Sequence, residues 1–352
     1  MIAPDRPSSV RQGEEVNLDS LNKYLAGHRP ELGLITTQQQ FPGGYSNLTY
    51  LLRSAEGEFI LRRPPFGATI KSAHDMGREF KVLSMIRDHY PKVPTPVIYC
   101  GDSEVIGAPF YLMERLNGVI LRPGDIQTIK LAPAEMRSVS ESLVDNLVAL
   151  HAIDIQRTGL VQLGKPDGYI ARQVEGWTKR YAAARTEPIK SMDDLITWLL
   201  QNQPSDNDAT LLHNDYKYDN LVLDERDLKT IRGVLDWEMA TVGDPWMDVG
   251  ASLAYWAEEK DGELARVFNI SWLPGNLTRR EFVERYVLLS SKPGRSPLFY
   301  YVFGLFKNAV IAQQIFARWK QGHSKDSRFG QLIHVIKDLG RRGVAAIETD
   351  SI

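Results

Sequence analysis

The sequence predicts an α+β fold in which an antiparallel sheet with one long helix precedes a mainly helical half. Two observations support this prediction. Up to about residue 113, short apolar runs are bounded by Gly and Pro residues, as is typical of strands and hairpins. After Gly118, apolar residues instead recur at the spacing of amphipathic helices. We therefore expect an N-terminal lobe over residues 1–115 and a C-terminal lobe over residues 116–352.

The N-terminal lobe is expected to contain a β-hairpin. Glu56-Gly57 is a turn pair between two strand-like runs, and Pro64-Pro65 ends the second run. Apolar residues at helical spacing follow, and Pro94 and Pro96 then break the chain before two further short runs. The expected elements are a helix over residues 18–27, strands over 48–54 and 59–63, a helix over 73–89, and strands over 97–100 and 109–113.

The C-terminal lobe is expected to be helical except for one hairpin. Pro133 lies near the start of a long amphipathic pattern that ends at about Leu150. The polar turn at residues 224–229 separates two short apolar runs, which predicts a second hairpin. The further expected elements are helices near 177–185 and 193–201, strands over 221–223 and 231–235, and helices over most of 246–346.

Composition excludes several classes of protein. Hydrophobic residues make up 43% and charged residues 24% of the chain, which is ordinary for a globular protein and not for a disordered one. A net charge of −2 gives no bulk attraction to nucleic acid, and Cys100 is the only cysteine. The longest apolar run, residues 300–306, is too short for a membrane helix. We expect a cytoplasmic protein without nucleic-acid or membrane partners; the oligomeric state stays open.

The segment His213 to Asn220 carries the strongest chemical signal. Its outline is H-x-D-x-x-x-x-N, and Asp236 follows on the far side of the predicted hairpin. Phosphoryl transfer needs a carboxylate that takes the proton of the attacking hydroxyl, together with oxygen ligands for Mg²⁺. Asp215 is the predicted base, and Asn220 and Asp236 are the predicted metal ligands.

Two other interpretations of this segment stay open. Asp and Asn are common in turns, so the first is a solvated polar loop whose residues do nothing jointly. The second is a metallohydrolase site, in which one His and three oxygen ligands bind a metal harder than zinc. His213 is expected to brace the loop by hydrogen bonds. We expect His151 to be a core or helix-capping residue, and Asp244 and Asp248 to cap the next helix and support the loop.

A second set of residues suits the phosphates of a nucleotide. Gly43, Gly44 and Ser46 lie just before the first hairpin, where free backbone N–H groups can form an anion-binding concavity. Strand alternation places Arg62 on one face of residues 59–63, and Glu79 on the following helix is expected to hold it as an ion pair. An ordinary turn and an ordinary charged strand end are the alternatives.

These residues together resemble the aminoglycoside phosphotransferase family, relatives of choline kinase with a protein-kinase-like fold. The resemblance rests on LLHNDYKYDNLVLDE and GVLDWEMATVGDPWMDVG and extends over roughly residues 35–255. It implies a two-lobe fold with a five-stranded sheet, the catalytic and metal roles given above, and ATP and Mg²⁺ as cofactors. It also implies that the backbone at Glu114 and Leu116 meets the adenine edge.

The segment FILRRPP and the Trp after Asp236 are most similar to the branch whose relatives are joined to acyl-CoA dehydrogenases. Two residues depart from the family pattern. Asn214 stands where glycine is usual, and Arg62 stands where many relatives have lysine. Arginine keeps the charge but is a planar fork rather than a point charge.

The resemblance implies a kinase that moves the γ-phosphate of ATP to a hydroxyl of a small molecule. Eight Lys or Arg against two Asp lie between residues 307 and 342, which favours an anionic or CoA-linked hydroxy acid if this region lines the acceptor site. Basic outer faces of solvated helices are the other interpretation. Alternative functions are an aminoglycoside or choline-type kinase, and a nucleotide-binding pseudokinase without turnover.

Overall fold

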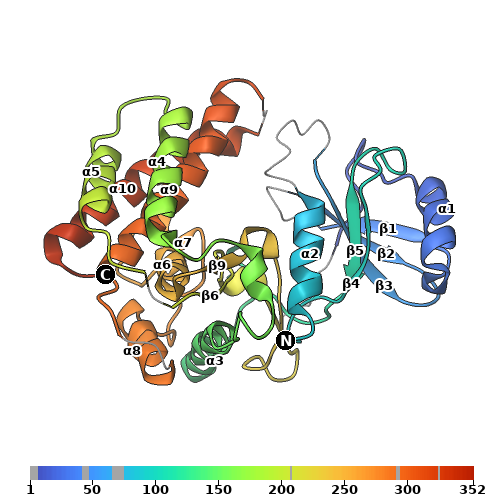
Figure 1. Cartoon of the computed structure of the whole chain (residues 1–352), viewed down its shortest axis with the longest axis horizontal. Helices are drawn as coiled ribbons and strands as arrows, with labels where there is room; N and C mark the ends of the chain where they lie inside the picture. Colours follow the sequence, from blue (N-terminus) through green and yellow to red (C-terminus); the bar gives the residue numbers. More distant parts are fainter. Residues whose placement is uncertain (1–6, 42–46, 66–74, 207, 291–293, 324–325) are drawn as a thin grey trace. The chain divides into compact units, whose positions relative to one another are not determined.

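The computed structural model describes residues 7–41, 47–65, 75–206, 208–290, 294–323 and 326–352. These residues divide into two compact units (Figure 1). The first unit comprises Met1–Ile120, Val222–Asp227 and Ile231–Glu238, and the second comprises the remainder of the chain. A hairpin from the middle of the sequence therefore packs with the N-terminal unit. The division of function between residues 1–115 and 116–352 stays a prediction.

The first unit contains a five-stranded antiparallel sheet in the order β1-β2-β3-β5-β4. This arrangement confirms the predicted fold class. Glu58 pairs with Arg53 across the turn at Gly57, as the hairpin prediction requires. The sequence prediction did not include β1. The strands are β1 (Thr37–Gln40), β2 (Leu48–Arg53), β3 (Glu58–Arg63), β4 (Pro96–Cys100) and β5 (Phe110–Glu114).

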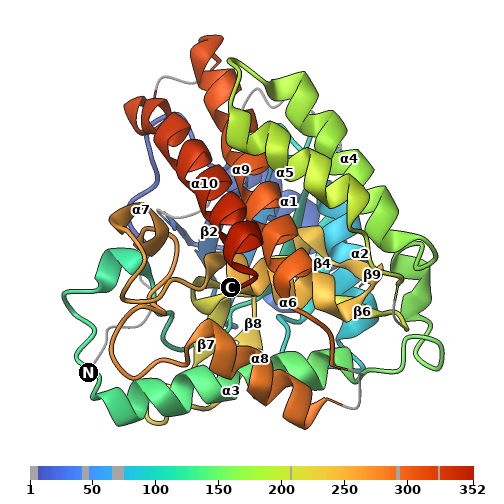
Figure 2. The ribbon, with the colours of Figure 1, turned by 90° about the vertical axis from the view of Figure 1, so that its left-hand side faces the viewer.

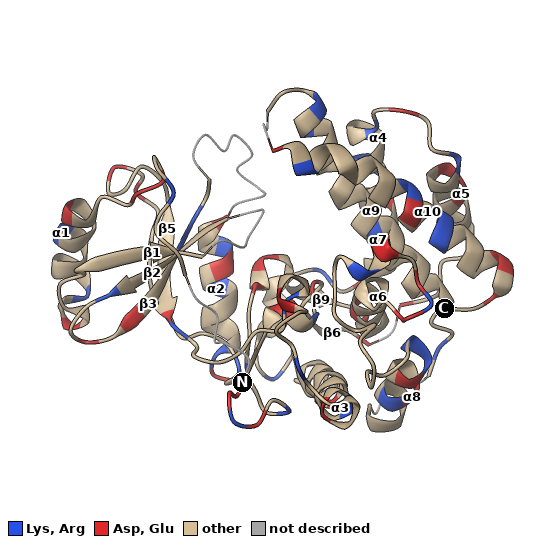
Figure 3. Cartoon of the chain, turned by 180° about the vertical axis from the view of Figure 1, so that it is seen from behind, with Lys and Arg blue, Asp and Glu red and all other residues tan. Residues whose placement is uncertain are grey.

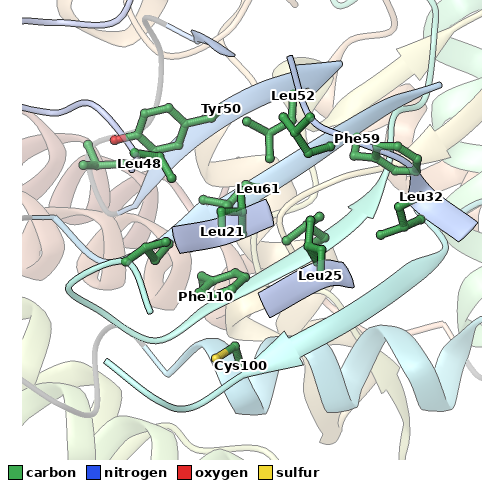
Figure 4. Packing of buried hydrophobic residues seen from close by; sticks show 14 residues of the cluster. Leu21, Leu25, Leu32, Leu48, Tyr50, Leu52, Phe59, Leu61, Cys100 and Phe110 are labelled. Atoms are coloured by element: carbon green, nitrogen blue, oxygen red, sulfur yellow. The ribbon is translucent and has the colours of Figure 1, made fainter. Parts of the chain in front are cut away.

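Two helices cover the two faces of this sheet. Helix α1 (Leu18–His28) starts at Asn17, whose side chain accepts a hydrogen bond from the Ser20 N–H. Its Leu21 and Leu25 pack on alternate residues of the strands, including Tyr50 and Leu61 (Figure 4). Helix α2 (Met76–Ile86) packs on β4 and β5. It starts later than predicted, although residues 73 and 74 lie outside the described part of the chain.

Strands β7 (Leu221–Leu223) and β8 (Ile231–Val234) form the second predicted hairpin. Leu223 exchanges both backbone hydrogen bonds with Val119, at 2.8 and 2.9 Å, which joins the hairpin to the segment after β5. Gly118 permits this approach, because a Cβ there would overlap the Leu223 carbonyl oxygen. The hairpin thereby holds the residues that follow it, including Asp236, in the first unit.

The second unit is mainly helical, as predicted. Helix α9 lies against α6, α10 and α4, and α3 lies beside α8 (Figure 2). Its helices are α3 (Pro133–His151), α4 (Tyr169–Ala184), α5 (Lys190–Gln201), α6 (Pro245–Tyr255), α7 (Glu263–Arg266), α8 (Arg279–Leu289), α9 (Leu298–Lys320) and α10 (Leu332–Thr349), with strands β6 (Thr210–Leu212) and β9 (Thr241–Gly243) between them.

Close contact of α6 with α9 depends on two glycines. A Cβ at Gly250 would overlap the Tyr300 carbonyl oxygen, and a Cβ at Gly304 would overlap the Gly250 carbonyl oxygen. The backbones of the two helices therefore touch at this crossing, which fixes α9 against α6. No helix within the described ranges has both the length and the apolar character that a membrane span requires.

Candidate active site

The loop that follows β6 is held by a buried carboxylate on α6. Asp248 accepts hydrogen bonds from the backbone N–H groups of His213 and Asn214, each at 2.7 Å. Its Oδ2 also lies 3.2 Å from Nε2 of His151, which is buried. Burial would raise the pKa of Asp248, but His151 and the loop N–H groups outweigh it and lower the pKa. The predicted bracing role of Asp248 and the core position of His151 are thus confirmed.

Asn214 adopts a left-handed backbone conformation with a φ of 66°. Only glycine adopts this conformation freely, and Asn tolerates it better than most other residues. The Asn214 Nδ2 donates to the Met239 carbonyl oxygen at 3.1 Å, and Nζ of Lys307 donates to the Asn214 carbonyl oxygen at 2.6 Å. Asn214 is therefore fixed through its backbone and its side chain immediately before Asp215.

Asp215 and Asn220 are brought together by the loop. Nδ2 of Asn220 donates to the carbonyl oxygen of Asp215 at 2.8 Å and to its Oδ2 at 2.9 Å. The Asp215 N–H donates to Nδ1 of His213 at 3.2 Å, which is the bracing contact expected of that histidine. The loop thus places both predicted chemical groups at one point of the second unit.

The charge around Asp215 favours its ionised form. Burial would raise the pKa of Asp215, but the positive charges of Lys217 and Lys307 and a hydrogen bond from Tyr255 help to outweigh it and lower the pKa. Nζ of Lys217 lies 3.4 Å from Oδ2 of Asp215 and over the ring of Tyr255. Asp215 is therefore a carboxylate at neutral pH and can accept a proton.

Sequence reasoning did not assign a role to Lys217 or Tyr255, and it counted Lys307 only as one of the basic residues between 307 and 342. Lys217 had a detectable signal, since it lies two residues beyond the predicted base within the same motif. Tyr255 ends α6 and Lys307 lies in the middle of α9, so only the fold brings them to the loop.

The donor set of Asn220 suits Mg²⁺. Its amide nitrogen is used in the two bonds to Asp215, while its Oδ1 has no hydrogen-bond partner among the described residues. An amide oxygen without a hydrogen-bond partner can act as a ligand for Mg²⁺. Mg²⁺ usually needs only one or two protein ligands, because phosphate oxygens and water supply the others.

In the first unit, Arg62 is the centre of a buried ionic cluster. Its guanidinium forms an ion pair with Glu79 of α2, as predicted, and donates from both Nη atoms to Oδ1 of Asp236 at 3.2 Å. Oε2 of Glu238 lies 3.8 Å from Nη2 of Arg62. Burial would lower the pKa of Arg62, but Glu79, Tyr111 and the other two carboxylates outweigh it and raise the pKa. The side chain is a permanent cation.

Asp236 has a left-handed φ of 64° and uses only Oδ1 for Arg62, so Oδ2 has no partner in the described part of the chain. Its side chain is 35% exposed, so this oxygen suits a metal ligand. Glu238, which the sequence analysis missed, accepts from Nδ2 of Asn47 at 3.0 Å and from Arg78 through its carbonyl oxygen. It fixes the segment after Asp236 within the first unit.

The remaining predicted nucleotide-binding residues have different outcomes. Gly43, Gly44 and Ser46 lie outside the described residues. Glu114 ends β5, and its N–H already donates to the Thr95 carbonyl oxygen at 2.9 Å. The Leu116 N–H has no partner within the ranges that the structure describes, so it is available to a ligand.

The predicted residues therefore form two groups. Asp215 and Asn220 belong to the second unit, and the group around Arg62 and Asp236 belongs to the first. Each group has a built arrangement of charges and hydrogen bonds of its own. Among the described residues, the group in the second unit offers a carboxylate and an amide oxygen without a hydrogen-bond partner, and the group in the first unit offers a fixed cation and one such carboxylate oxygen.

Comparison with known proteins agrees with this chemistry. Residues 37–283 match the family described as "Phosphotransferase enzyme family". Acyl-CoA dehydrogenase family member 11 of Rattus norvegicus is 34% identical over 336 residues, which are 93% of this chain and 43% of that protein. Family member 10 of Mus musculus is 36% identical over 326 residues, 90% of this chain and 30% of that protein. The chain thus spans less than half the length of these curated relatives.

Solved structures show the same architecture. A Ralstonia eutropha protein, assigned provisionally to the aminoglycoside phosphotransferases, superposes with a TM-score of 0.75 and 26% identity over 94% of this chain and 99% of its own. Spectinomycin phosphotransferase, solved with ADP and spectinomycin, has the same fold, with a TM-score of 0.58 and 11% identity over 94% of this chain and 99% of its own. With a two-lobe kinase-like fold and a family match over most of its length, the chain belongs to the phosphotransferase enzyme family.

Proposed function

We propose that this phosphotransferase moves the γ-phosphate of ATP, with Mg²⁺, to a hydroxyl group of a small molecule. The observation that carries the proposal is the state of Asp215. This carboxylate is held ionised by neighbouring cations, and Nδ2 of Asn220 donates one hydrogen bond to its Oδ2 and one to the Asp215 carbonyl oxygen. A positioned, ionised carboxylate is the group that an attacking hydroxyl requires.

Each residue has a distinct task in this reaction. Asp215 orients the acceptor hydroxyl and takes its proton as the oxygen attacks the γ-phosphorus. Arg62, a cation at all working pH values, offsets negative charge on the phosphates. Asn220 and Asp236 each offer an oxygen to Mg²⁺, which neutralises charge on the nucleotide when bound. The proposal requires these groups to act on one nucleotide.

Support for a purine nucleotide comes from the fold. Spectinomycin phosphotransferase was solved with ADP, and its fold is that of this chain. The backbone at Glu114 and Leu116 is the proposed contact for the adenine edge, where the Leu116 N–H offers a donor. Gly43, Gly44 and Ser46 are proposed to hold the phosphates, and Glu79 to hold Arg62 in place. A cytoplasmic location, where ATP is supplied, completes the proposal.

The acceptor is proposed to be a CoA-linked or other anionic hydroxy acid. Both relatives described above carry the name acyl-CoA dehydrogenase, and this chain matches a part of each. The basic residues of α10 do not add support. The helix carries both basic and acidic positions (Figure 3), and Arg341 pairs with Asp338 and Lys337 with Glu187. The buried Lys307 differs from them, since it has no acidic partner within the described ranges.

The test replaces the base and varies the acceptor. Asp215→Ala is expected to lower turnover by on the order of 10²-fold or more, the scale of a lost general base. Asp194→Ala is the matched control, because Asp194 forms only an exposed pair with Lys190. ADP release would be measured with hydroxyacyl-CoA thioesters beside aminoglycosides and choline, and unchanged turnover of Asp215→Ala would refute its role.

A second measurement separates binding from chemistry. Asp236→Ala is expected to weaken Mg-ATP binding by calorimetry, because it removes one of two proposed metal ligands. A thermal shift with Mg-ATP but no transfer to any acceptor would instead identify a pseudokinase. Phosphate release from esters without ATP would identify a metallohydrolase.

A further inference from the structure

Lys307 is a buried cation that makes one hydrogen bond to the described residues. It lies in the middle of α9 and is 4% exposed. Its ammonium donates to the Asn214 carbonyl oxygen at 2.6 Å, and its Nζ lies 5.9 Å from the centre of the Trp177 ring. No carboxylate of the described residues lies within ion-pair distance of it. Burying a charge in this way costs free energy, so its presence calls for a role.

The contact acts on the peptide that precedes the proposed base. Asn214 must keep its left-handed conformation, and two groups from different helices hold its two backbone atoms. Asp248 of α6 accepts from its N–H, and Lys307 of α9 donates to its carbonyl oxygen. The Asp215 side chain starts from the next Cα, so the plane of this peptide sets where its carboxylate can lie.

We propose that Lys307 is a positioning residue for phosphoryl transfer, which fixes the Asn214–Asp215 peptide through its ammonium and so orients the Asp215 carboxylate. This inference rests on the proposed function, in which Asp215 is the base. Lys307 touches neither phosphate nor acceptor in this role. It acts through Asn214.

The same charge is one of those that lower the pKa of Asp215. The charged groups that act on Lys307 are Asp215 and Lys217 of the loop, Asp248 of α6 and Arg180 of α4. Burial lowers the pKa of Lys307 to about 8, so the side chain is charged at neutral pH. Above pH 8 the ammonium loses its proton, and with it the positive charge that stabilises the carboxylate.

The experiment compares three variants by kcat, acceptor KM, Mg-ATP affinity and pH profile. Lys307→Met fills the same space without charge, Lys307→Arg keeps a charge that does not titrate, and Lys179→Met on α4 is an exposed control. Lys307→Met is expected to lower kcat about tenfold to a hundredfold, the scale of a misplaced catalytic group, with Mg-ATP affinity unchanged. The wild-type kcat should fall above pH 8, whereas that of Lys307→Arg should not.

Each other outcome overturns the inference. If Lys307→Met changes only the acceptor KM, the ammonium binds substrate instead of positioning Asp215. If the kcat of Lys307→Met stays within about twofold of wild type, Lys307 has no role in the reaction. Should Lys307→Met fail to fold, Lys307→Arg decides: an alkaline fall in kcat identical to that of wild type would end the proposal. A fully active Asp215→Ala would defeat the proposed function itself, whereas an inactive Asp215→Ala beside an unimpaired Lys307→Met would defeat only this inference.

Discussion

The buried charge of Lys307 has a measurable consequence for stability. Its pKa is about 8 in the folded protein, against an ordinary value of 10.5 that it regains on unfolding. Between these pH values the unfolded chain binds more protons than the folded protein, so the free energy of unfolding rises with pH. At pH 7 the difference between the two pKa values means that the charged Lys307 lowers the free energy of unfolding by about 3 kcal/mol, relative to a neutral side chain.

We expect Lys307→Met to abolish this contribution. Between pH 7 and pH 9.5, titration of Lys307 alone should raise the wild-type free energy of unfolding by about 2 kcal/mol relative to the variant. Urea denaturation at both pH values, followed by tryptophan fluorescence, gives the two free energies. Taking the difference between wild type and variant cancels groups that titrate equally in both proteins, such as the exposed Lys179.

A difference between wild type and Lys307→Met that does not change with pH would refute the reasoning, because Lys307 would then have an ordinary pKa. The variant is expected to be more stable at pH 7 and yet less active. Such a trade between stability and activity is common at sites where a charge is buried for function. A purely structural lysine would show the opposite, with stability lost at pH 7.

Two further predictions concern the scaffold of the loop. Gly250→Ala places a Cβ against the Tyr300 carbonyl oxygen. It is expected to lower the free energy of unfolding, measured by urea denaturation, by about 1–3 kcal/mol. A variant as stable as the wild type would show that α6 and α9 separate without cost. Asn214→Ala should be less stable than Asn214→Gly by about 1 kcal/mol, because only glycine keeps a φ of 66° without strain. Equal stability of these two variants would mean that the loop relaxes to another conformation.

The secondary structure was predictable where local signals agree with the fold. The β2–β3 hairpin has a turn pair flanked by apolar strands, and the structure pairs it as expected. Strand β1 has the sequence TQQQ, which has no apolar alternation. It forms because Gln40 pairs with Tyr50, and because the Gln38 side chain bonds both backbone groups of Val16 at 2.9 Å. Such tertiary contacts leave no periodic signal.

Contacts of the candidate site were easiest to predict where the residues lie close together in the sequence. Asp215 and Asn220 are five positions apart and meet within one loop, so their spacing revealed them. Lys307 is 93 positions from Asn214 and reaches it only because α9 packs against α6. A count of basic residues along the chain could not separate Lys307, which is buried, from Arg341, which is exposed.

The departure from glycine at position 214 follows from the path of the chain. The backbone leaves the second unit after Leu221 and forms the hairpin that leads to Asp236. Apart from the turn residues Leu228–Thr230, it rejoins the second unit at Met239. Nδ2 of Asn214 bonds the carbonyl oxygen of Met239, the first residue of the return. Glycine would satisfy the left-handed conformation but could not make this bond. Asparagine does both, so a single residue fixes the peptide before Asp215, the proposed base, and anchors the chain at Met239 within the second unit.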